Sequence, residues 1–194
     1  VIKLQKVLLD AQRNCDVALR FSFEINAKQL PKPLYLLSEN IPDFAVAVNG
    51  VKIPYREEGY DIDPAFKRLD ISHAVIPGKN EIILTGRFWQ RPELIRWLYR
   101  EKDLSANYYD CDFDFESVTY DTELESIYLI GDFCVVSKAP FTTGERRAVF
   151  TDGPFVLTDP VRTLRRGDFT QQGFLFFAGS MTVGFDLEIE KANG

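Results

Sequence analysis

One short stretch of the sequence combines the residue types that protein surfaces use to hold sugars. A pyranose stacks its apolar face on a flat aromatic ring and needs convergent polar groups for its hydroxyls. Trp89 supplies such a ring, with polar side chains beside it. The predicted carbohydrate-binding residues are Arg87, Trp89, Gln90, Arg91, Trp97 and Tyr108. Anchoring of the local chain and packing against another domain are the alternative roles for these residues.

Residues that could carry out catalysis are few. His73 is the only histidine, so any Ser-His-Asp or Cys-His site would require it. Its position directly after Ser72 favours a capping or surface role instead. A glycosidase needs only two facing carboxylates, and Glu57-Glu58 or Glu123/Glu125 could be proposed. Nothing in their spacing separates an acid from a base, so no catalytic residue is predicted.

Acidic residues at alternate positions are the strongest candidates for a metal site. They are Asp110, Asp112, Asp114 and Glu116. Alternate strand residues lie about 6–7 Å apart, which is too far for all four carboxylates to bind one calcium ion. The charged outer face of an edge strand explains the row more simply. No metal ligand and no cofactor are therefore predicted.

Composition excludes several classes of partner. The 194 residues carry a net charge of −6, so a basic face for nucleic acid is not expected. No apolar run approaches the roughly 18 residues that span a membrane, and residues 1–10 do not form a signal peptide. Met181 is the only methionine, which favours a piece of a longer polypeptide.

The three cysteines point to unpaired thiols. Cys15, Cys111 and Cys134 are widely spaced and odd in number, which indicates neither a disulfide framework nor a metal site. Cys111 and Cys134 lie in strand-like patterns and are expected to be inert core residues. Unpaired thiols favour a reducing, cytoplasmic compartment.

The elements that must position these residues are mostly strands. Apolar residues alternate with polar ones over residues 17–25, 109–115 and 181–189. Shorter strands are expected at 44–48, 51–53, 81–85, 127–136, 148–150, 155–157 and 174–177, with a bend at Gly131. Residues 92–104 form a helical excursion near the sugar-binding candidates. The prediction is one all-β domain over residues 1–194, a jelly-roll β-sandwich.

Two groups of motifs resemble a known family. The first is FAVAVNG at 44–50, followed by LDIS at 69–72 and PGKNEIIL at 77–84. These segments resemble the sugar-binding domain of family-2 glycoside hydrolases and related α-L-rhamnosidases. The second is ESIYLIGDF at 125–133 with GFLFFAG at 173–179, which resembles closing strands of a sandwich in such enzymes. The likeness covers most of residues 15–190.

The resemblance implies a galactose-binding-like accessory domain of a bacterial glycoside hydrolase. Family catalytic carboxylates lie in a separate barrel domain, and no position here matches them. The implied partners are the catalytic domain of the same parent chain and, second, carbohydrate. Such domains often hold a structural calcium ion in a loop, for which no ligands are assigned here.

Two other functions remain open. The alternatives are a free-standing carbohydrate-binding module and a structural spacer without a ligand. An accessory domain or spacer should expose an apolar patch, whereas a free-standing module should have a self-contained surface. An enzyme should show a deep pocket with two close carboxylates.

Overall fold

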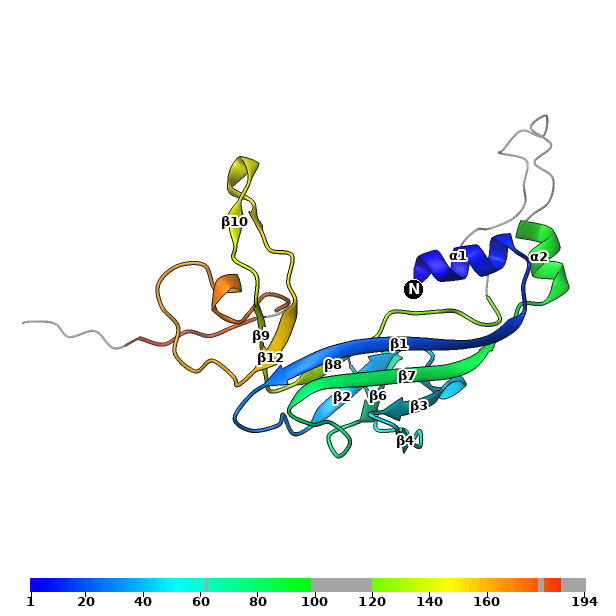
Figure 1. Ribbon diagram of the computed structural model, residues 1–194, viewed down its shortest axis with the longest axis horizontal. Coiled ribbons are helices and arrows are strands. Elements are labelled where there is room, and N and C mark those ends of the chain that lie inside the picture. The colour runs from blue at the N-terminus through cyan, green and yellow to red at the C-terminus, as the bar shows by residue number, and fades with distance from the viewer. Residues whose placement is uncertain (62, 99–119, 178–179, 186–194) are drawn as a thin grey trace, which may run out of the picture.

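Two β-sheets dominate the computed structural model, which describes residues 1–61, 63–98, 120–177 and 180–185 (Figure 1). The first sheet contains β1 (Cys15–Asn26), β3 (Ala45–Val48), β4 (Val51–Ile53), β7 (Gly78–Phe88), β9 (Cys134–Ser137) and β12 (Phe155–Thr158). The second contains β2 (Leu34–Ser38), β5 (Tyr60–Asp61), β6 (Asp63–Asp70) and β8 (Tyr128–Gly131). Their strand orders are β4-β3-β7-β1-β12-β9 and β5-β6-β2-β8.

Helices and turns make up a smaller part of the described chain. The helices are α1 (Ile2–Asp10) and α2 (Pro92–Leu98), and the short 3-10 turns are η1 (Ile41–Asp43), η3 (Glu145–Arg147) and η4 (Thr170–Gln172). Strands β10 (Thr142–Thr143) and β11 (Val149–Phe150) form a separate small hairpin. None of the described helices has the length and hydropathy that crossing a bilayer requires.

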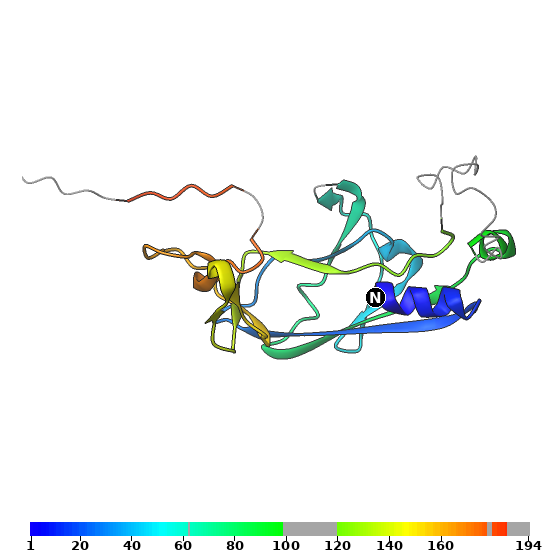
Figure 2. The ribbon, with the colours of Figure 1, turned by 90° about the horizontal axis from the view of Figure 1, so that it is seen from above.

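The two sheets pack face to face around one apolar core. Figure 2 shows β1 and β7 in one layer and β8 in the other. Buried leucines of β2 and β6, such as Leu36 and Leu69, face buried residues of β3 and β7, such as Val46 and Leu84. The predicted all-β class with sandwich-like sheets is thus confirmed.

The longest ladder joins β1 and β7. These strands pair antiparallel over eleven positions, from Cys15 opposite Phe88 to Ile25 opposite Gly78. Leu19 and Ile25 on β1 are buried, and the even-numbered positions 16, 18, 20 and 22 are exposed. The period-two pattern of the sequence therefore predicts this strand and its two faces.

Other predicted elements are also present. Strands β3, β4, β11 and β12 lie within or within one residue of their expected ranges, and β7 is longer than predicted. Asn49 and Gly50 both have positive φ, 50° and 80°, as the expected two-residue hairpin requires. The predicted helix is present over Pro92–Leu98, while residues 99–104 and the strand expected at 109–115 lie outside the described residues. Cys134 is buried, as expected.

Three predicted strands need correction. The single strand expected over 127–136 is two strands, because the chain leaves the four-stranded sheet after Gly131 and enters the six-stranded sheet at Cys134. A Cβ at Gly131 would lie 2.8 Å from the Pro33 oxygen, so the crossover requires glycine. Residues 174–177 form only an isolated bridge at Phe174. Residues 181–185 belong to no strand, and 186–189 lie outside the described residues.

Residues 134–177 form a lobe at one end of the sandwich, and we call this segment the C-terminal lobe (Figure 1). It joins the sandwich through β12, which pairs in parallel with β1 at only two positions, Ile25 and Asn26. The backbone N–H of Val135 donates to the Gly173 oxygen at 2.8 Å and holds the end of the lobe against β9. The β10–β11 hairpin projects from the lobe in Figure 1.

Two asparagines connect the β3–β4 hairpin to the start of β7. The buried Asn80 side chain donates to the oxygens of Ile76 and Gly78 and accepts from the Ile76 amide. Asn49 Nδ2 donates to Asn80 Oδ1 at 2.8 Å, and Asn49 Oδ1 accepts from the Glu81 amide. These bonds satisfy the buried Asn80 amide and fix the backbone of the loop before β7.

Replacing the Asn80 side chain tests its structural importance. Asn80→Ala removes three hydrogen bonds that this buried side chain makes with the backbone of Ile76 and Gly78, so it should lower the free energy of unfolding by about 2–3 kcal/mol. The exposed neighbour Lys79→Ala is the matched control and should change it by less than about 0.5 kcal/mol. Urea unfolding followed by circular dichroism measures both, and equal effects would contradict this assignment.

Candidate functional site

The predicted carbohydrate-binding residues lie where β7 ends and α2 begins. The alternation of β7 continues here, so that Phe88 and Gln90 are fully buried while Arg87 and Trp89 are exposed on the other side. Trp89 exposes 42% of its surface. Arg87 extends into solvent and lies 3.7 Å from the Asp16 carboxylate, across the β1–β7 ladder. The structure therefore brings Arg87 and Trp89 to one surface.

Gln90 has a structural role. Its Nε2 donates to the Thr122 oxygen at 2.5 Å, and its Oε1 accepts from the Asp121 amide at 2.9 Å. Its backbone N–H and carbonyl both bond to the Asn14 side chain. Because this residue is completely buried and both amide atoms are used, Gln90 offers no polar atom to a ligand. It connects three distant segments of the chain instead.

Arg91 also contacts the neighbouring segment. Its backbone N–H donates to Asp121 Oδ2 at 2.8 Å, and its guanidinium lies 3.3 Å from Asp121 Oδ1. Trp97 belongs to α2, but its side chain lies outside what the structure describes, as does Tyr108. The main-chain oxygen of Arg87 accepts from the Thr122 hydroxyl at 3.4 Å, so this segment also contacts the end of β7. Among the candidates that the structure describes, the side chains of Arg87 and Trp89 are exposed at the end of β7.

The lone histidine borders a shallow, open depression. This depression is lined by Lys32, Pro33, Asp70, Ser72 and His73. The Ser72 hydroxyl donates to Asp70 at 2.5 Å and accepts from the Leu34 amide at 2.8 Å. The hydroxyl therefore closes the turn after β6 and joins it to β2, and it is not placed as a nucleophile activated by the histidine. His73 is exposed in this turn, at the surface position that the sequence favours.

The environment of one carboxylate, that of Glu123, raises its pKa. Partial burial raises the pKa of Glu123, and the neighbouring charges of Glu125 and Glu39 raise it further. The main-chain oxygen of Glu123 accepts a hydrogen bond from the Asn40 side chain. Within residues 1–61, 63–98, 120–177 and 180–185, no group of three or more His, Cys, Asp or Glu could hold a metal ion. The acidic row at 110–116 lies outside those ranges.

Exposed phenylalanines are concentrated in the C-terminal lobe. In the sandwich, Phe44 and Phe88 are buried. All the described phenylalanines that are exposed lie between residue 150 and residue 185. Those in the lobe are Phe150, Phe155, Phe169, Phe176 and Phe177, which we call the lobe phenylalanines. Phe176 is 66% exposed, yet its ring packs edge-on against Phe155 with centroids 5.1 Å apart.

Sequence reasoning missed the lobe phenylalanines as a functional group. In the sequence they resemble ordinary core residues of short strands, because alternation does not show whether a second layer covers them. Their dense occurrence over residues 150–177 was the available signal. An exposed group of large apolar residues on a folded chain usually marks a contact surface.

The Glu123 environment predicts a pH-dependent stability. Because the pKa of Glu123 is raised in the folded state, ionising this carboxyl costs more free energy in the folded than in the unfolded chain. The folded state therefore loses stability as the pH rises above 4.5, the ordinary pKa of this group. Glu123→Gln removes this cost, so it should raise the midpoint of urea unfolding at pH 7. It should leave the midpoint unchanged at about pH 3.5, where the carboxyl of Glu123 is protonated in both the folded and the unfolded chain. The exposed control Glu145→Gln should change neither midpoint. A lower midpoint for Glu123→Gln at pH 7 would show that the ionised carboxylate is stabilising.

Comparisons with known proteins leave the functional assignment to the residues themselves. No family model, no curated protein and no solved structure matches the chain. The resemblance to sugar-binding domains of glycoside hydrolases therefore depends on the motifs at 44–50, 69–72, 77–84, 125–133 and 173–179. In the structure, the first three motifs form the β3–β4 hairpin and the turns around β7, where their asparagines and glycines have backbone roles.

Proposed function

We propose that this chain is a non-catalytic jelly-roll domain of a bacterial glycoside hydrolase that packs against the catalytic domain of the same polypeptide. The observation that carries the proposal is the exposure of the lobe phenylalanines. Exposing an aromatic ring to water forgoes roughly 2 kcal/mol of burial free energy, so a group of them favours a surface that a partner covers.

The lobe is suited to contact another domain. It lies at one end of the sandwich and contacts β1 through two ladder positions and the Lys138–Glu24 ion pair. Its phenylalanines are held by neighbouring rings and turns: Phe174 and Phe177 pack edge-on with centroids 5.8 Å apart, and Phe150 lies against Gly144. Aromatic side chains that are held in place lose little entropy on binding, which makes them effective interface residues.

The other functions have weaker support. A free-standing module should have a self-contained surface, whereas the lobe phenylalanines are open to solvent. An enzyme should have convergent catalytic groups, whereas Ser72 is committed to Asp70 and Leu34 in an open depression. A structural spacer without a ligand would expose the same apolar surface, and it differs from the proposal in having no contact with carbohydrate.

Carbohydrate contact has one structural argument in its favour. Trp89 and Arg87 are exposed on the same side at the end of β7, as stacking on a sugar requires. Gln90 and Arg91, however, bind the segment around Asp121. The polar groups that would recognise hydroxyls are thus partly used within the protein. We therefore assign packing as the main function, and carbohydrate contact at Trp89 stays a prediction.

A dye that fluoresces on exposed apolar surface tests the packing proposal. The isolated chain should enhance the fluorescence of anilinonaphthalene sulfonate, and Phe176→Asp should reduce the enhancement at least about twofold. Tyr60→Asp is the matched control, because it removes an aromatic residue of similar exposure, 51%, from β5 outside the lobe. Its enhancement should equal that of the unchanged chain.

Two results would contradict the proposal. One is a chain that does not enhance the dye's fluorescence, because its phenylalanines would then not form a binding surface. The other is an equal loss in both variants, because the dye would then not distinguish the lobe from the sandwich. Circular dichroism should show that both variants keep their β content, since both altered side chains are exposed.

A further inference from the structure

The six-stranded sheet has a long strand with one unpaired side. β1 pairs with β7 over eleven positions on one side. On its other side, the described residues supply partners only at Ile25 and Asn26, from β12. The edge from Cys15 to Glu24 thus lacks a neighbouring strand within the described chain. Exposed sheet edges are normally covered or blocked, because their free N–H and C=O groups recruit another strand.

Helix α1 covers only half of this edge. In Figures 1 and 2, α1 lies alongside the N-terminal half of β1, and no element lies along the half that leads to β12. Leu9 of α1 is buried against the core, and Gln5 Oε1 accepts from the Leu124 amide at 2.6 Å. The uncovered half, Arg20–Glu24, is called the open edge below.

Side-chain burial changes along the same strand. Leu19 and Ile25 face the core and are 7% and 2% exposed. Phe21 and Phe23 lie on the same face between them but are only partly buried. A neighbouring strand on the open edge would cover the free sides of these two rings. Within the described chain the open edge thus lacks backbone partners, and its two phenylalanines pack on the core but stay partly exposed. Its last residue, Glu24, has an ionic partner from the lobe, Lys138 at 2.7 Å.

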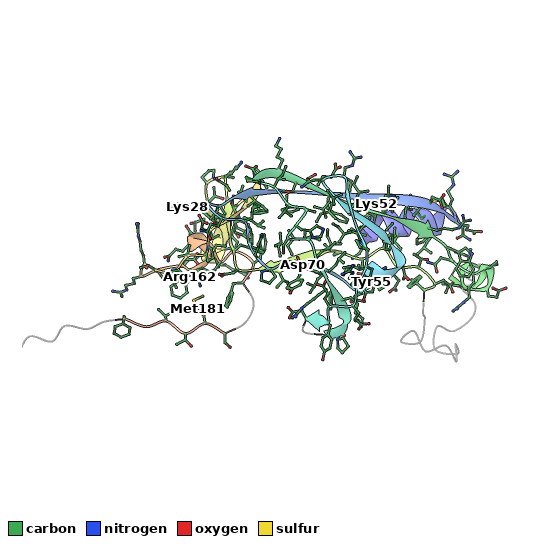
Figure 3. The ribbon with its side chains drawn as sticks, turned by 90° about the horizontal axis from the view of Figure 1, so that it is seen from below. Lys28, Lys52, Tyr55, Asp70, Arg162 and Met181 are labelled. Carbon is green, nitrogen blue, oxygen red and sulfur yellow. The ribbon has the colours of Figure 1, made fainter. Side chains whose placement is uncertain are left out.

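One segment of the chain has the properties of the missing strand. Residues 181–185 belong to no described helix or strand and lie clear of both sheets (Figure 3, where Met181 is labelled). Met181, Val183 and Phe185 alternate with Thr182 and Gly184. Phe185 is 84% exposed, the largest fraction among the exposed hydrophobic residues that the structure describes. A five-residue alternating segment equals the open edge in length.

The ladder shows that this segment can reach the open edge. Gly173 bonds to Val135, Val135 lies opposite Leu157, and Leu157 lies opposite Ile25. Three strand spacings of about 4.8 Å place Gly173 about 14 Å from Ile25. The eight residues from Gly173 to Met181 span up to about 26 Å when extended, which is enough. A strand arriving from this end runs antiparallel to β1.

We propose that residues 181–185 add to the open edge of β1 as an antiparallel strand of the same chain. Their odd-numbered apolar residues then face the core beside Phe21 and Phe23, and Thr182 and Gly184 face solvent beside Ser22. Backbone hydrogen bonds supply the attachment, and the apolar side chains select the face. The segment 181–185 then has two conformations, one bound to the open edge and one free. The open edge is thus a strand-binding surface that a segment of the same chain covers.

Amide hydrogen exchange of the whole chain tests this assignment. Every second amide of β1 points away from β7 and is protected only when the open edge is occupied. These amides at positions 20–24 should exchange slowly in the unchanged chain and at least about tenfold faster in Val183→Asp, which places a charge on the core-facing side. Thr182→Asp is the matched control, with the same charge on the solvent side, and should retain the protection.

One internal control and two contrary outcomes complete this experiment. The β1 amides that bond to β7 should stay protected in every variant, which shows that the sandwich remains folded. Equal exchange at the open edge in all three proteins would overturn the proposal. Protection that disappears on dilution as a dimer dissociates would show that a second copy supplies the strand and would overturn the same-chain assignment.

Discussion

The ladder between β1 and β7 is the constraint on which the rest of the structure depends. It joins residues 15–25 to residues 78–88 over eleven consecutive positions. On the far side of β7 lies β3, so this ladder places the β3–β4 hairpin. The end of β7 carries Trp89 and Gln90, and the end of β1 carries β12 and the lobe. Both candidate surfaces thus take their positions from this one pairing.

The alternating pattern predicts strands well where one face of a sheet is buried and the other is exposed to solvent. β1 shows this pattern clearly, and its predicted range lies inside the observed one. β2 was missed because Leu34, Leu36, Leu37 and Ser38 are all buried, so that the strand lacks a polar face. Strand β6 was missed for another reason: half of its residues are charged, and they interrupt the apolar alternation.

Residues 174–177 and 181–185 show the limit of the same reasoning. Alternation predicts that a segment can pair, but pairing also requires a sheet edge within reach. Among the described residues, the bridge between Phe174 and Val135 is the only strand-type pairing that these segments make. Their apolar residues remain exposed, while the edge of β1 remains open. The alternating pattern therefore shows that these segments are able to form strands, although they are not paired as strands in this conformation.

The candidate site was predictable only in part. The sequence places Arg87 and Trp89 together, and strand alternation explains why both are exposed. It could not show that Gln90 faces inward, because an amide serves a ligand or a buried backbone group equally well. The lobe phenylalanines could be identified only from the fold, since exposure depends on which layers cover a strand. Their exposure is the central observation for function.

Hydroxyl-radical footprinting tests most directly the proposal that the lobe phenylalanines pack against another domain. It would compare oxidation of Phe150, Phe155, Phe169, Phe176 and Phe177 in this chain alone and in the longer polypeptide that the packing proposal requires. The packing proposal predicts that these rings are oxidised in the isolated chain and protected in the longer polypeptide, while the exposed Tyr60 reacts equally in both. Equal oxidation of the phenylalanines in the two proteins would contradict it, because no partner domain would then cover the lobe.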